Sequence, residues 1–547
     1  MAAVNRPARQ TRTPPATAGS GSAHGQRNDE DIQVQPPSQT DGPTRPTTRA
    51  PASGAPATNA PDRLDPAARA TIGVLLVASF VVILNETIMN VALPRLMDTF
   101  GVSADAVQWL ATAFMLTMAV VIPTTGYLLR RFSTRTVFLL AMGLFSAGTL
   151  LAGLAPGFGV LLAARVVQAS GTAIMLPLLM TTILNLVPPA RRGTMMGNVS
   201  IVISVAPAIG PTISGLILQF LSWRFMFLLV LPIALAALLI GAPRLGRNAE
   251  AGATPLSVPS LLLAVPGFGG LVYGLSKIGG GHGAAEASGP DAGAVLALVV
   301  AAACLAAFAA LQLRLQRTDR ALLDLRPFTY RPFTVSLAMM VLAMVALFGV
   351  IILLPMYLQN VRGLDTLGTG LMLLPGGVLM GVLAPFVGRL YDRFGPRPLV
   401  VPGSVLLSVV LFAYTRLGPD TPIGLLVALH LLMSLSFAFI FTPAFTTALN
   451  PLPHHLHSHG SAVLSTLQQL GGAAGTALLV GIMAAGTATA AAAGADAVSA
   501  DVAGFRQGFT AAAVASLGVV LCSLFLRKAP RDAAPEGAAR PVGPEVD

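Results

Sequence analysis

Charged side chains are scarce in this sequence. Asp, Glu, Lys and Arg make up only 10% of its 547 residues, whereas a soluble domain usually draws about a quarter of its residues from this set. Apolar residues make up 54%, and they occur in runs of about 20, the length of helix that crosses a hydrocarbon core of ~30 Å. Lipid offers no hydrogen bonds to an open backbone, so repeated runs of this length predict a helical bundle. We therefore expect an all-α polytopic membrane protein.

Cysteine and lysine are also rare, and each scarcity argues against a class of protein. The two cysteines, Cys304 and Cys522, both lie inside apolar runs, which argues against a disulfide framework and favours a packing role. Neither Lys277 nor Lys528 follows a glycine, so the sequence has no Gly-x4-Gly-Lys-Ser/Thr phosphate loop. ATP hydrolysis by this chain is therefore excluded as its energy source. The net charge of +11 comes from arginines in short loops, which fits membrane topology better than nucleic-acid binding.

Two polar tails enclose the apolar part of the chain. Residues 1–66 and 529–547 cannot bury enough apolar surface to order themselves, so we expect disordered tails, and the first lacks the apolar core of a signal peptide. Between them, fourteen apolar segments are expected to span the membrane: 70–93, 106–128, 136–155, 158–184, 195–220, 225–243, 257–279, 292–313, 333–357, 367–387, 398–416, 422–445, 462–486 and 508–526.

The distribution of arginine and lysine predicts the orientation of these spans. With the N-terminus inside, the inner loops and the C-terminal flank hold eighteen Arg and Lys residues, from Arg130 to Arg531. The outer loops hold six: Arg95, Arg224, Lys277, Arg362, Arg416 and Arg506. Short cytoplasmic loops carry such an excess of positive charge. The sequence therefore predicts a multi-pass protein of the cell membrane with both termini in the cytoplasm. One inner loop, 446–461, has histidines in place of Arg or Lys.

An internal repeat predicts how the spans are grouped. The stretch Gly126-Tyr-Leu-Leu-Arg-Arg-Phe returns as Gly388-Arg-Leu-Tyr-Asp-Arg-Phe after 262 residues, the offset that also separates the first span from the ninth. Two parallel six-helix halves, 67–245 and 326–528, with two extra spans inserted in 246–325, explain this register. Parallel repeats about an axis along the membrane normal are a transporter architecture, with the substrate site between the halves.

Three stretches of the first half carry polar or small residues at specific spacings. The first span ends in Leu84-Asn-Glu-Thr-Ile-Met-Asn-Val-Ala-Leu-Pro94, and the fourth contains Arg165-Val-Val-Gln-Ala-Ser-Gly-Thr-Ala173. The fifth places small residues and a proline at Gly197, Ala206, Gly210, Pro211, Ser214 and Gly215. Over residues 70–526 the chain resembles the major facilitator superfamily, in its fourteen-span drug:proton antiporter branch, and within it the lincomycin and multidrug efflux group.

The resemblance implies a function and its partners. It implies proton-coupled efflux of small amphipathic drugs or antibiotics by alternating access, with a lipophilic substrate, protons and the lipid bilayer as partners. It implies no cofactor other than the coupling proton, no nucleic acid and no obligate protein partner. A dedicated exporter of one endogenous metabolite or antibiotic is the alternative. A membrane-embedded enzyme is more distant, because no catalytic dyad or metal set lies at one depth, so no enzymatic activity is expected.

The acid of the first span departs from the branch pattern. The branch usually has Asp at the position of Asn85, whereas here the acid is Glu86, about 100° further around the helix. A charged carboxylate within a span is costly, so Glu86 is expected to face the bundle interior and to exchange a proton near neutral pH. The alternative is that Glu86 only holds helices together through hydrogen bonds.

Arg165 is expected at the depth of Glu86, roughly 10 Å from the outer boundary at ~1.5 Å per residue. We expect it to modulate protonation of Glu86, directly or through Gln168 and water. The alternative is a static ion pair or an arginine bonded to backbone carbonyls. Further polar side chains expected in the substrate cavity are Asn85, Asn90, Gln168, Gln359, Gln468 and Gln469.

Two further motifs follow from the resemblance. The fifth-span pattern keeps every spacing of the exporter motif, with Ala206 and Ser214 in place of glycines, and implies the direction of transport; ordinary helix packing is the alternative. The repeated loop is the cytoplasmic latch between halves, with the expected residues Gly126, Arg130, Arg131, Gly388, Asp392, Arg393 and Arg397. Because Arg130 replaces the usual acid in the first half, we expect Asp392 to be the working latch acid. For Arg130 and Arg131 the alternative is a basic loop that only sets topology.

Histidines in the second half suggest a metal site at first sight. His454, His455, His457 and His459 lie close together in the sequence, but a polar loop leading into the next helix explains them better, and no metal is expected. His430, inside the twelfth span, is expected to be a packing histidine rather than a proton relay.

Overall fold

The computed structural model describes residues 65–246, 257–279 and 292–526, and every regular element in these ranges is a helix. The main helices are α1 (Pro66–Phe100), α2 (Ala104–Arg131), α3 (Thr134–Gly153), α4 (Phe158–Leu186), α5 (Arg192–Phe220), α6 (Phe225–Leu228), α7 (Val230–Gly241), α8 (Val258–Ala264), α9 (Gly270–Gly279), α10 (Ala292–Leu315), α11 (Arg331–Asn360), α12 (Thr366–Phe394), α13 (Arg397–Tyr414), α14 (Ile423–Leu449), α15 (His457–Ala492) and α16 (Ala497–Phe525).

Short polar residues set the ends of several helices. The side chains of Ser103, Ser133, Asp365 and Asp496 accept hydrogen bonds from the first turns of α2, α3, α12 and α16, which satisfies backbone N–H groups that have no partner within the helix. Gly101 ends α1 in the left-handed conformation, with φ of 60°, and its N–H donates to the carbonyl of Met97. A single π-helical turn, Val265–Gly269, joins α8 to α9, so that these two helices form one span.

The prediction of an all-α polytopic membrane protein is confirmed. Thirteen helices in the described ranges are long and apolar enough to cross a membrane, and a shorter apolar stretch, Phe225–Gly241, is formed by α6 and α7. Each of the fourteen predicted segments coincides with one of these. Large apolar side chains such as Phe220 and Leu239 are exposed on the outside, as expected of a surface that lipid covers.

Two loops are shorter than the sequence predicts. The stretch 487–507 was expected to be a loop, but α15 continues to Ala492 and α16 already begins at Ala497, because alanine strongly favours helix. Arg506, expected in an outer loop, therefore lies in α16, where its Nε donates to the carbonyl of Leu417. The inner loop 446–461 is also shorter than expected, since α14 ends at Leu449 and α15 starts at His457.

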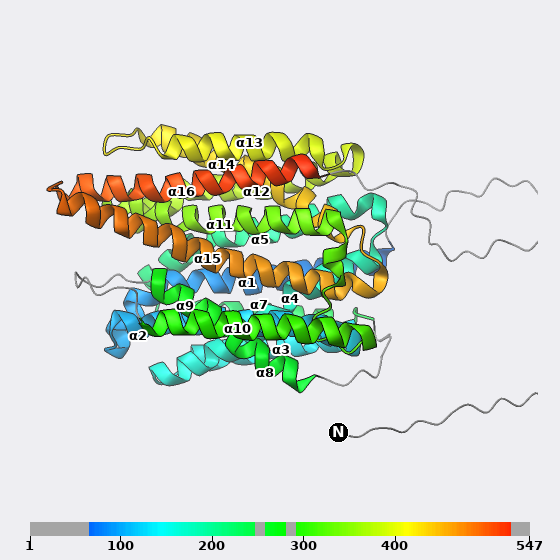
Figure 1. Cartoon of the computed structure of the whole chain (residues 1–547). Helices are drawn as coiled ribbons and strands as arrows, with labels where there is room; N and C mark the ends of the chain where they lie inside the picture. The colour runs from blue at the N-terminus through cyan, green and yellow to red at the C-terminus, as the bar shows by residue number, and fades with distance from the viewer. Residues whose placement is uncertain (1–64, 247–256, 280–291, 527–547) are drawn as a thin grey trace, which may run out of the picture. The chain divides into compact units, whose positions relative to one another are not determined.

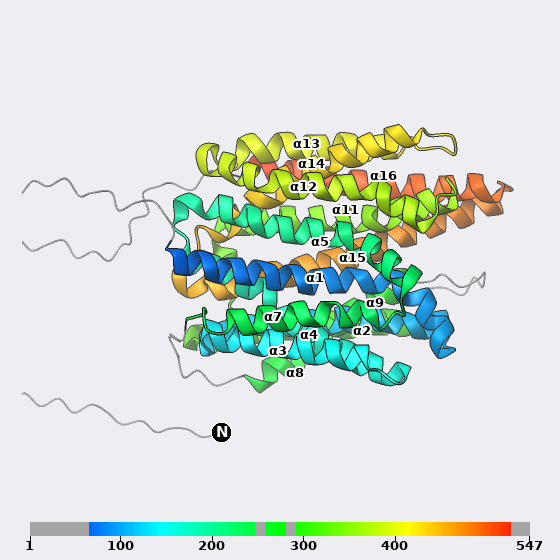
Figure 2. The ribbon, with the colours of Figure 1, turned by 180° about the vertical axis from the view of Figure 1, so that it is seen from behind.

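The helices lie side by side in two groups (Figures 1 and 2). Helices α1–α7 pack mainly on one another, as do α11–α16, and the two groups meet where α5 packs along α12 and α2 along α15. The inserted helices α8, α9 and α10 pack together, and α9 also contacts α2 and α15. The start of α1 and the end of α16 lie at the same end of the bundle, called here the terminal end (Figure 1).

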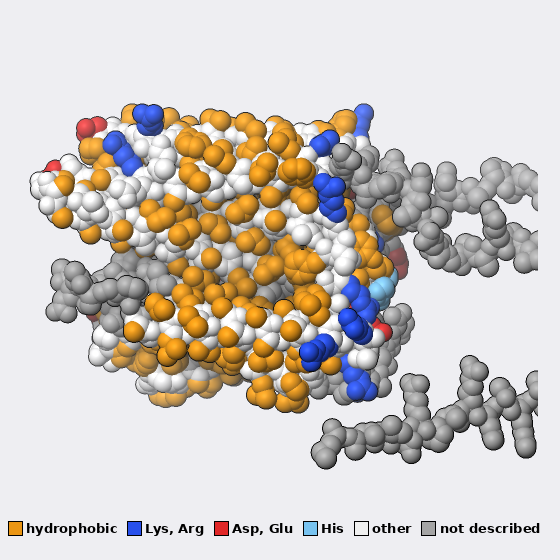
Figure 3. Space-filling view, in the orientation of Figure 1, with side chains coloured by type: hydrophobic (Ala, Val, Ile, Leu, Met, Phe, Trp, Pro, Cys, Tyr) orange, Lys and Arg blue, Asp and Glu red, His pale blue; other side chains and the backbone are white. Residues whose placement is uncertain are grey.

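Side-chain types are distributed along the bundle as a membrane would require. Hydrophobic side chains cover the middle of the face seen in Figure 3, and Lys and Arg side chains gather mainly at the terminal end. An apolar belt with positive charge concentrated on one side is the pattern of a multi-pass membrane protein.

Candidate functional site

A cavity of about 220 Å³ lies between the two groups of helices. Its walls come from α1, α2, α4 and α5 of the first group and from α11 and α15 of the second. Most of the lining is apolar and adaptable, including Phe114, Met115, Met118, Met344 and Phe348. A mostly apolar cavity with a few polar groups is the usual form of a small-molecule site.

Glu86 brings a carboxyl group to the cavity wall. Its side chain is half-buried and lines the cavity. The neighbouring Asn85 is only 2% exposed and does not line the cavity, and its Oδ1 has no hydrogen-bond partner among the described residues. The shift of the acid by one position along α1 therefore decides which of the two side chains reaches the cavity.

Arg165 of α4 is held in place on the same cavity wall. Its Nη1 donates to Oε1 of Gln168 at 2.6 Å, its Nε donates to the carbonyl of Leu110 at 3.5 Å, and its guanidinium lies 4.0 Å from the centre of the Phe114 ring. Glu86 is not among its direct contacts in the described part of the chain, although the opposite charges of the two groups attract each other. A fixed positive charge therefore lies beside a carboxyl group that keeps access to the cavity.

Gln168 supports Arg165 from behind. It is fully buried, does not line the cavity, and donates from Nε2 to Oγ1 of Thr149 on α3 at 2.8 Å. Its backbone lies against Gly148, where an added Cβ would come within 2.5 Å of the Gln168 nitrogen. Close approach of α3 to α4 at this glycine thus positions Gln168, which in turn orients Arg165.

The second group supplies hydrogen-bonding side chains on the opposite wall. Gln468 and Gln469, both expected in the cavity, do line it, and so does Ser465, which the sequence reasoning missed. Residues at i, i+3 and i+4 share a helix face, so the spacing from Gln468 and Gln469 could have identified Ser465. The Oγ of Ser465 is buried without a hydrogen-bond partner among the described residues.

Gln359 and Asn90 are the two remaining residues that were expected in the cavity. Gln359 is exposed near the end of α11 and does not line this cavity. The side chain of Asn90 lies outside the described part of the structure, as does that of Pro211 in the fifth-span motif.

Small residues of the fifth-span motif allow α5 to approach two neighbours. A Cβ added to Gly197 would lie 2.5 Å from the carbonyl oxygen of Ala384 on α12, and one added to Gly210 would lie 2.3 Å from Oγ1 of Thr87 on α1. Ala206 and Ser214 are fully buried, whereas Gly215 faces open space. The motif therefore serves close packing of α5 against both α1 and α12.

Asp392 joins α12 to α5 at the terminal end. Its carboxylate accepts hydrogen bonds from the N–H of Gly193 at 2.9 Å, and from the N–H and Oγ1 of Thr194 at 3.0 and 2.8 Å. These are the first residues of α5, whose N-terminus favours a negative charge. Gly388, one turn earlier on α12, lies against the backbone of Gly193, where an added Cβ would come within 2.3 Å of the carbonyl oxygen.

The equivalent contact in the first half uses arginine and histidine. Nη1 of Arg130, near the end of α2, lies 3.2 Å from Nε2 of His459 on α15, and Gly126 packs against the same histidine. Arg131 is the last residue of α2, Arg393 lies over the ring of Phe394, and Arg397 donates to the carbonyl of Leu524. Arg130 thus has a specific partner on the other half.

The four clustered histidines have separate surroundings. His454 and His455 are exposed, whereas His457 and His459 are buried within α15 and not in a loop as expected. His457 contacts Oδ1 of Asn185 and the carbonyl of Leu452. Within the described ranges no group of three or more His, Cys, Asp or Glu side chains could hold a metal ion. His430 contacts the carbonyl of Leu373 on α12.

Comparison with known proteins identifies the family. The sequence profile of the Major Facilitator Superfamily matches residues 75–476. The chain belongs to the Major Facilitator Superfamily. Within it, the chain is 39% identical over 463 residues to the uncharacterised transporter YcnB of Bacillus subtilis and to the lincomycin resistance protein LmrB of Listeria monocytogenes, matches that cover 84% of this chain and 96% of each relative. It is 31% identical over 426 residues to the multidrug resistance protein B homolog of Mycobacterium tuberculosis, 77% of either chain.

Solved structures of the superfamily share the fold. The human organic anion transporter MFSD10 aligns with a TM-score of 0.60 over 84% of this chain and 100% of its own. The proton:xylose symporter XylE aligns with a TM-score of 0.56 over 84% of this chain and 96% of its own. Both are only 16% identical to this superfamily member, so the likeness concerns the fold alone.

Proposed function

We propose that this transporter exports small amphipathic, drug-like molecules across the cell membrane in exchange for protons. The observation that carries the proposal is the carboxyl group of Glu86 on the wall of a mostly apolar cavity between the two groups of helices. The names of the relatives, lincomycin resistance and multidrug resistance, support export as the direction.

The chemistry of the cavity supports a proton exchange at Glu86. With its proton released, the carboxylate can attract a cationic group of a substrate, while Met and Phe side chains adapt to the apolar part. Protonation removes that attraction and favours release. The guanidinium of Arg165, fixed on the same cavity wall, attracts the negatively charged form of Glu86. Inward movement of one proton contributes ~2.3 kcal/mol per 100 mV, before any pH gradient is added.

We further propose that the terminal end faces the cytoplasm. The gathering of Lys and Arg at this end supports that orientation. In this orientation the contacts of Asp392 and Arg130 close the cytoplasmic side, and alternating access opens it when they separate. The cycle needs only the coupling proton as cofactor and no obligate protein partner, and it performs no enzymatic reaction.

Substrate transport driven by a pH gradient in proteoliposomes tests the proposal. A pH gradient that is acidic outside should drive uphill movement of lincomycin or of the lipophilic cation tetraphenylphosphonium in wild-type vesicles. Glu86→Gln keeps the size of the side chain but cannot exchange a proton, so uphill transport should fall at least tenfold. Asp98→Asn changes an exposed acid on the same helix and should behave as wild type. Coupled transport by Glu86→Gln at the wild-type rate would exclude Glu86 as the coupling residue.

The same vesicles separate a multidrug exporter from a dedicated one. A dedicated exporter of one metabolite would use the same acid, but its proton flux would respond to a single compound. We expect stimulation by several unrelated lipophilic cations, because the lining is mostly apolar and rich in methionine.

A further inference from the structure

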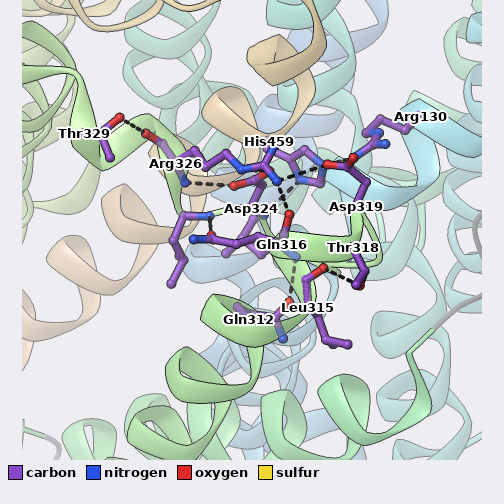
Figure 4. Close-up of polar contacts among 12 residues, drawn as sticks. Arg130, Gln312, Leu315, Gln316, Thr318, Asp319, Asp324, Arg326, Thr329 and His459 are labelled. Carbon is purple, nitrogen blue, oxygen red and sulfur yellow. Dashed lines mark hydrogen bonds and ion pairs between the residues drawn. The ribbon is translucent and has the colours of Figure 1, made fainter. Parts of the chain in front are cut away.

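His459 lies at a junction of three parts of the molecule (Figure 4). It is the third residue of α15 and is fully buried. On one side, its Nε2 faces Nη1 of Arg130 at the end of α2. On the other side, its Nδ1 lies 3.2 Å from the backbone N–H of Asp324, in the segment that connects α10 to the second half. One imidazole ring therefore contacts both halves and the connecting segment.

Hydrogen bonds extend from this junction to the inserted helices. Oε1 of Gln312 on α10 accepts from the N–H of Leu322 at 2.9 Å and of Leu323 at 3.3 Å, which fixes the backbone just before Asp324. Nε2 of Gln312 donates to Oγ of Ser260 on α8 at 2.8 Å. Both Gln312 and Ser260 are fully buried. Hydrogen bonds, together with the backbone from Leu323 to Asp324, thus connect α8 and α10 to His459.

Further contacts shape the connecting segment around Asp324. Its Oδ1 accepts from the N–H of Arg326 at 2.8 Å, and Nε of Arg326 lies 3.7 Å from Oδ2. Arg326 also donates to the carbonyl of Gln316 and to Oδ1 of Asp319, and Gln316 accepts from the N–H of Leu325 (Figure 4). The carboxylate of Asp324 is 2% exposed. Its N–H is therefore presented to His459 by a folded segment.

The ring of His459 cannot satisfy both of its partners at once. The amide N–H of Asp324 and the guanidinium of Arg130 are both donors, whereas a neutral imidazole has one acceptor nitrogen and one N–H. In either tautomer, one of the two contacts is a hydrogen bond and the other places two donors face to face. By contrast, the carboxylate of Asp392 accepts three hydrogen bonds from Gly193 and Thr194. Of these two contacts at the terminal end, the one at His459 is the weaker.

We propose that His459, Arg130 and Asp324 form a lock at the terminal end, that the inserted helices hold it through Gln312, and that the terminal end opens by its release. Helices α8–α10 then control access to the cavity instead of merely widening the bundle. The lock rests on the proposed alternating access, but it can be tested without substrate and without a pH gradient.

Distances between spin labels at the terminal end test the lock. In a background with Cys304 and Cys522 replaced by serine, labels at the exposed positions 132, after α2, and 394, at the end of α12, report separation of the two halves. His459→Ala removes both contacts and should raise the population with a long distance about tenfold, the factor expected for one lost hydrogen bond to a charged group. His459→Glu provides an acceptor oxygen for each donor and should lower this population. His454→Ala, in the exposed turn before α15, should leave it unchanged.

A second pair of variants tests the part assigned to the inserted helices. Gln312→Leu keeps the side-chain size but frees the backbone of Leu322 and Leu323, so it should also raise the long-distance population. Arg130→Gln combined with His459→Ala should open the terminal end no further than His459→Ala alone, because that change already removes the Arg130 contact. Equal distance distributions for wild type and His459→Ala would overturn the lock, and opening by His459→Ala without opening by Gln312→Leu would overturn the role of α8–α10. Neither readout depends on drug or proton transport, so the proposed function can fail independently.

Discussion

At the scale of single residues, the site depends on side chains that never touch the cavity. Arg165 carries the charge, but Gln168 and Thr149 behind it determine where that charge lies. Asn85 and Glu86 differ by one position in sequence, yet only Glu86 lines the cavity. Whether a side chain contributes to the cavity therefore depends on its direction from the helix as much as on its residue type.

Gly148 offers a direct test of this support. In Gly148→Ala the new Cβ would lie 2.5 Å from the backbone nitrogen of Gln168, so α3 and α4 must separate and Arg165 must move. We expect a loss of about 1–3 kcal/mol in stability, measured as a lower melting temperature in detergent. Gly143→Ala is the matched control, because a Cβ at this position on the same helix meets nothing within 4 Å. Equal melting temperatures for the two variants would contradict the packing argument.

At this scale the sequence predicted the charged residues better than their partners. Glu86 and Arg165 could be singled out because a charged residue inside an apolar run can be recognised from the sequence alone. Gln168 was expected in the cavity, and the structure places it behind Arg165 instead, because only the contact with α3 reveals which way it points. The contact of Arg130 with His459 joins residues 329 positions apart, which no local pattern encodes.

At the scale of helices, α5 is the element on which the two groups depend most. Asp392 caps its first turn, Gly197 brings it against α12, and Gly210 brings it against α1. Spans were predictable because hydropathy and length alone define them. Their ends were less so: the alanine-rich end of α15 and the start of α16 are helical without being strongly apolar, so the boundary at 508 was wrong.

Substitution of Gly197 should slow transport. A methyl group at this position would lie 2.5 Å from the carbonyl oxygen of Ala384, so Gly197→Ala forces α5 and α12 apart along their contact. We expect at least a severalfold lower rate of tetraphenylphosphonium export from vesicles at an unchanged amount of protein. Gly215→Ala lies on the same helix in open space and should retain the wild-type rate. A wild-type rate in Gly197→Ala would show that this close approach is dispensable.

Substitution of Asp392 should weaken closure at the terminal end. Asp392→Asn removes the charge at the N-terminus of α5 and leaves one acceptor oxygen for three donors, a loss of about 1–2 kcal/mol. The spin-label distance between positions 132 and 394 should lengthen in a larger fraction of molecules. Asp420→Asn, in an exposed loop, is the control. Unchanged distances in Asp392→Asn would mean that this contact does not hold the halves together.

At the scale of the whole molecule, charged groups are confined to a few positions in an apolar bundle. Glu86 and Arg165 lie together at the cavity, and the contacts of Asp392 and His459 lie at the terminal end. The superfamily fold arranges the two groups of helices so that the cavity lies between them. In the proposed cycle, the contacts at the terminal end control whether the cavity opens there. The proposed transport cycle must couple two events, proton binding at the cavity and separation at the terminal end.

Proton release on substrate binding tests the central claim most directly. Purified protein in weakly buffered detergent solution near neutral pH is mixed with tetraphenylphosphonium, and the protons released per bound cation are counted with a pH indicator. Since a cation and a proton compete for Glu86, the wild type should release up to one proton per cation, and Glu86→Gln should release none. Release from Glu86→Gln equal to that of the wild type would contradict the account.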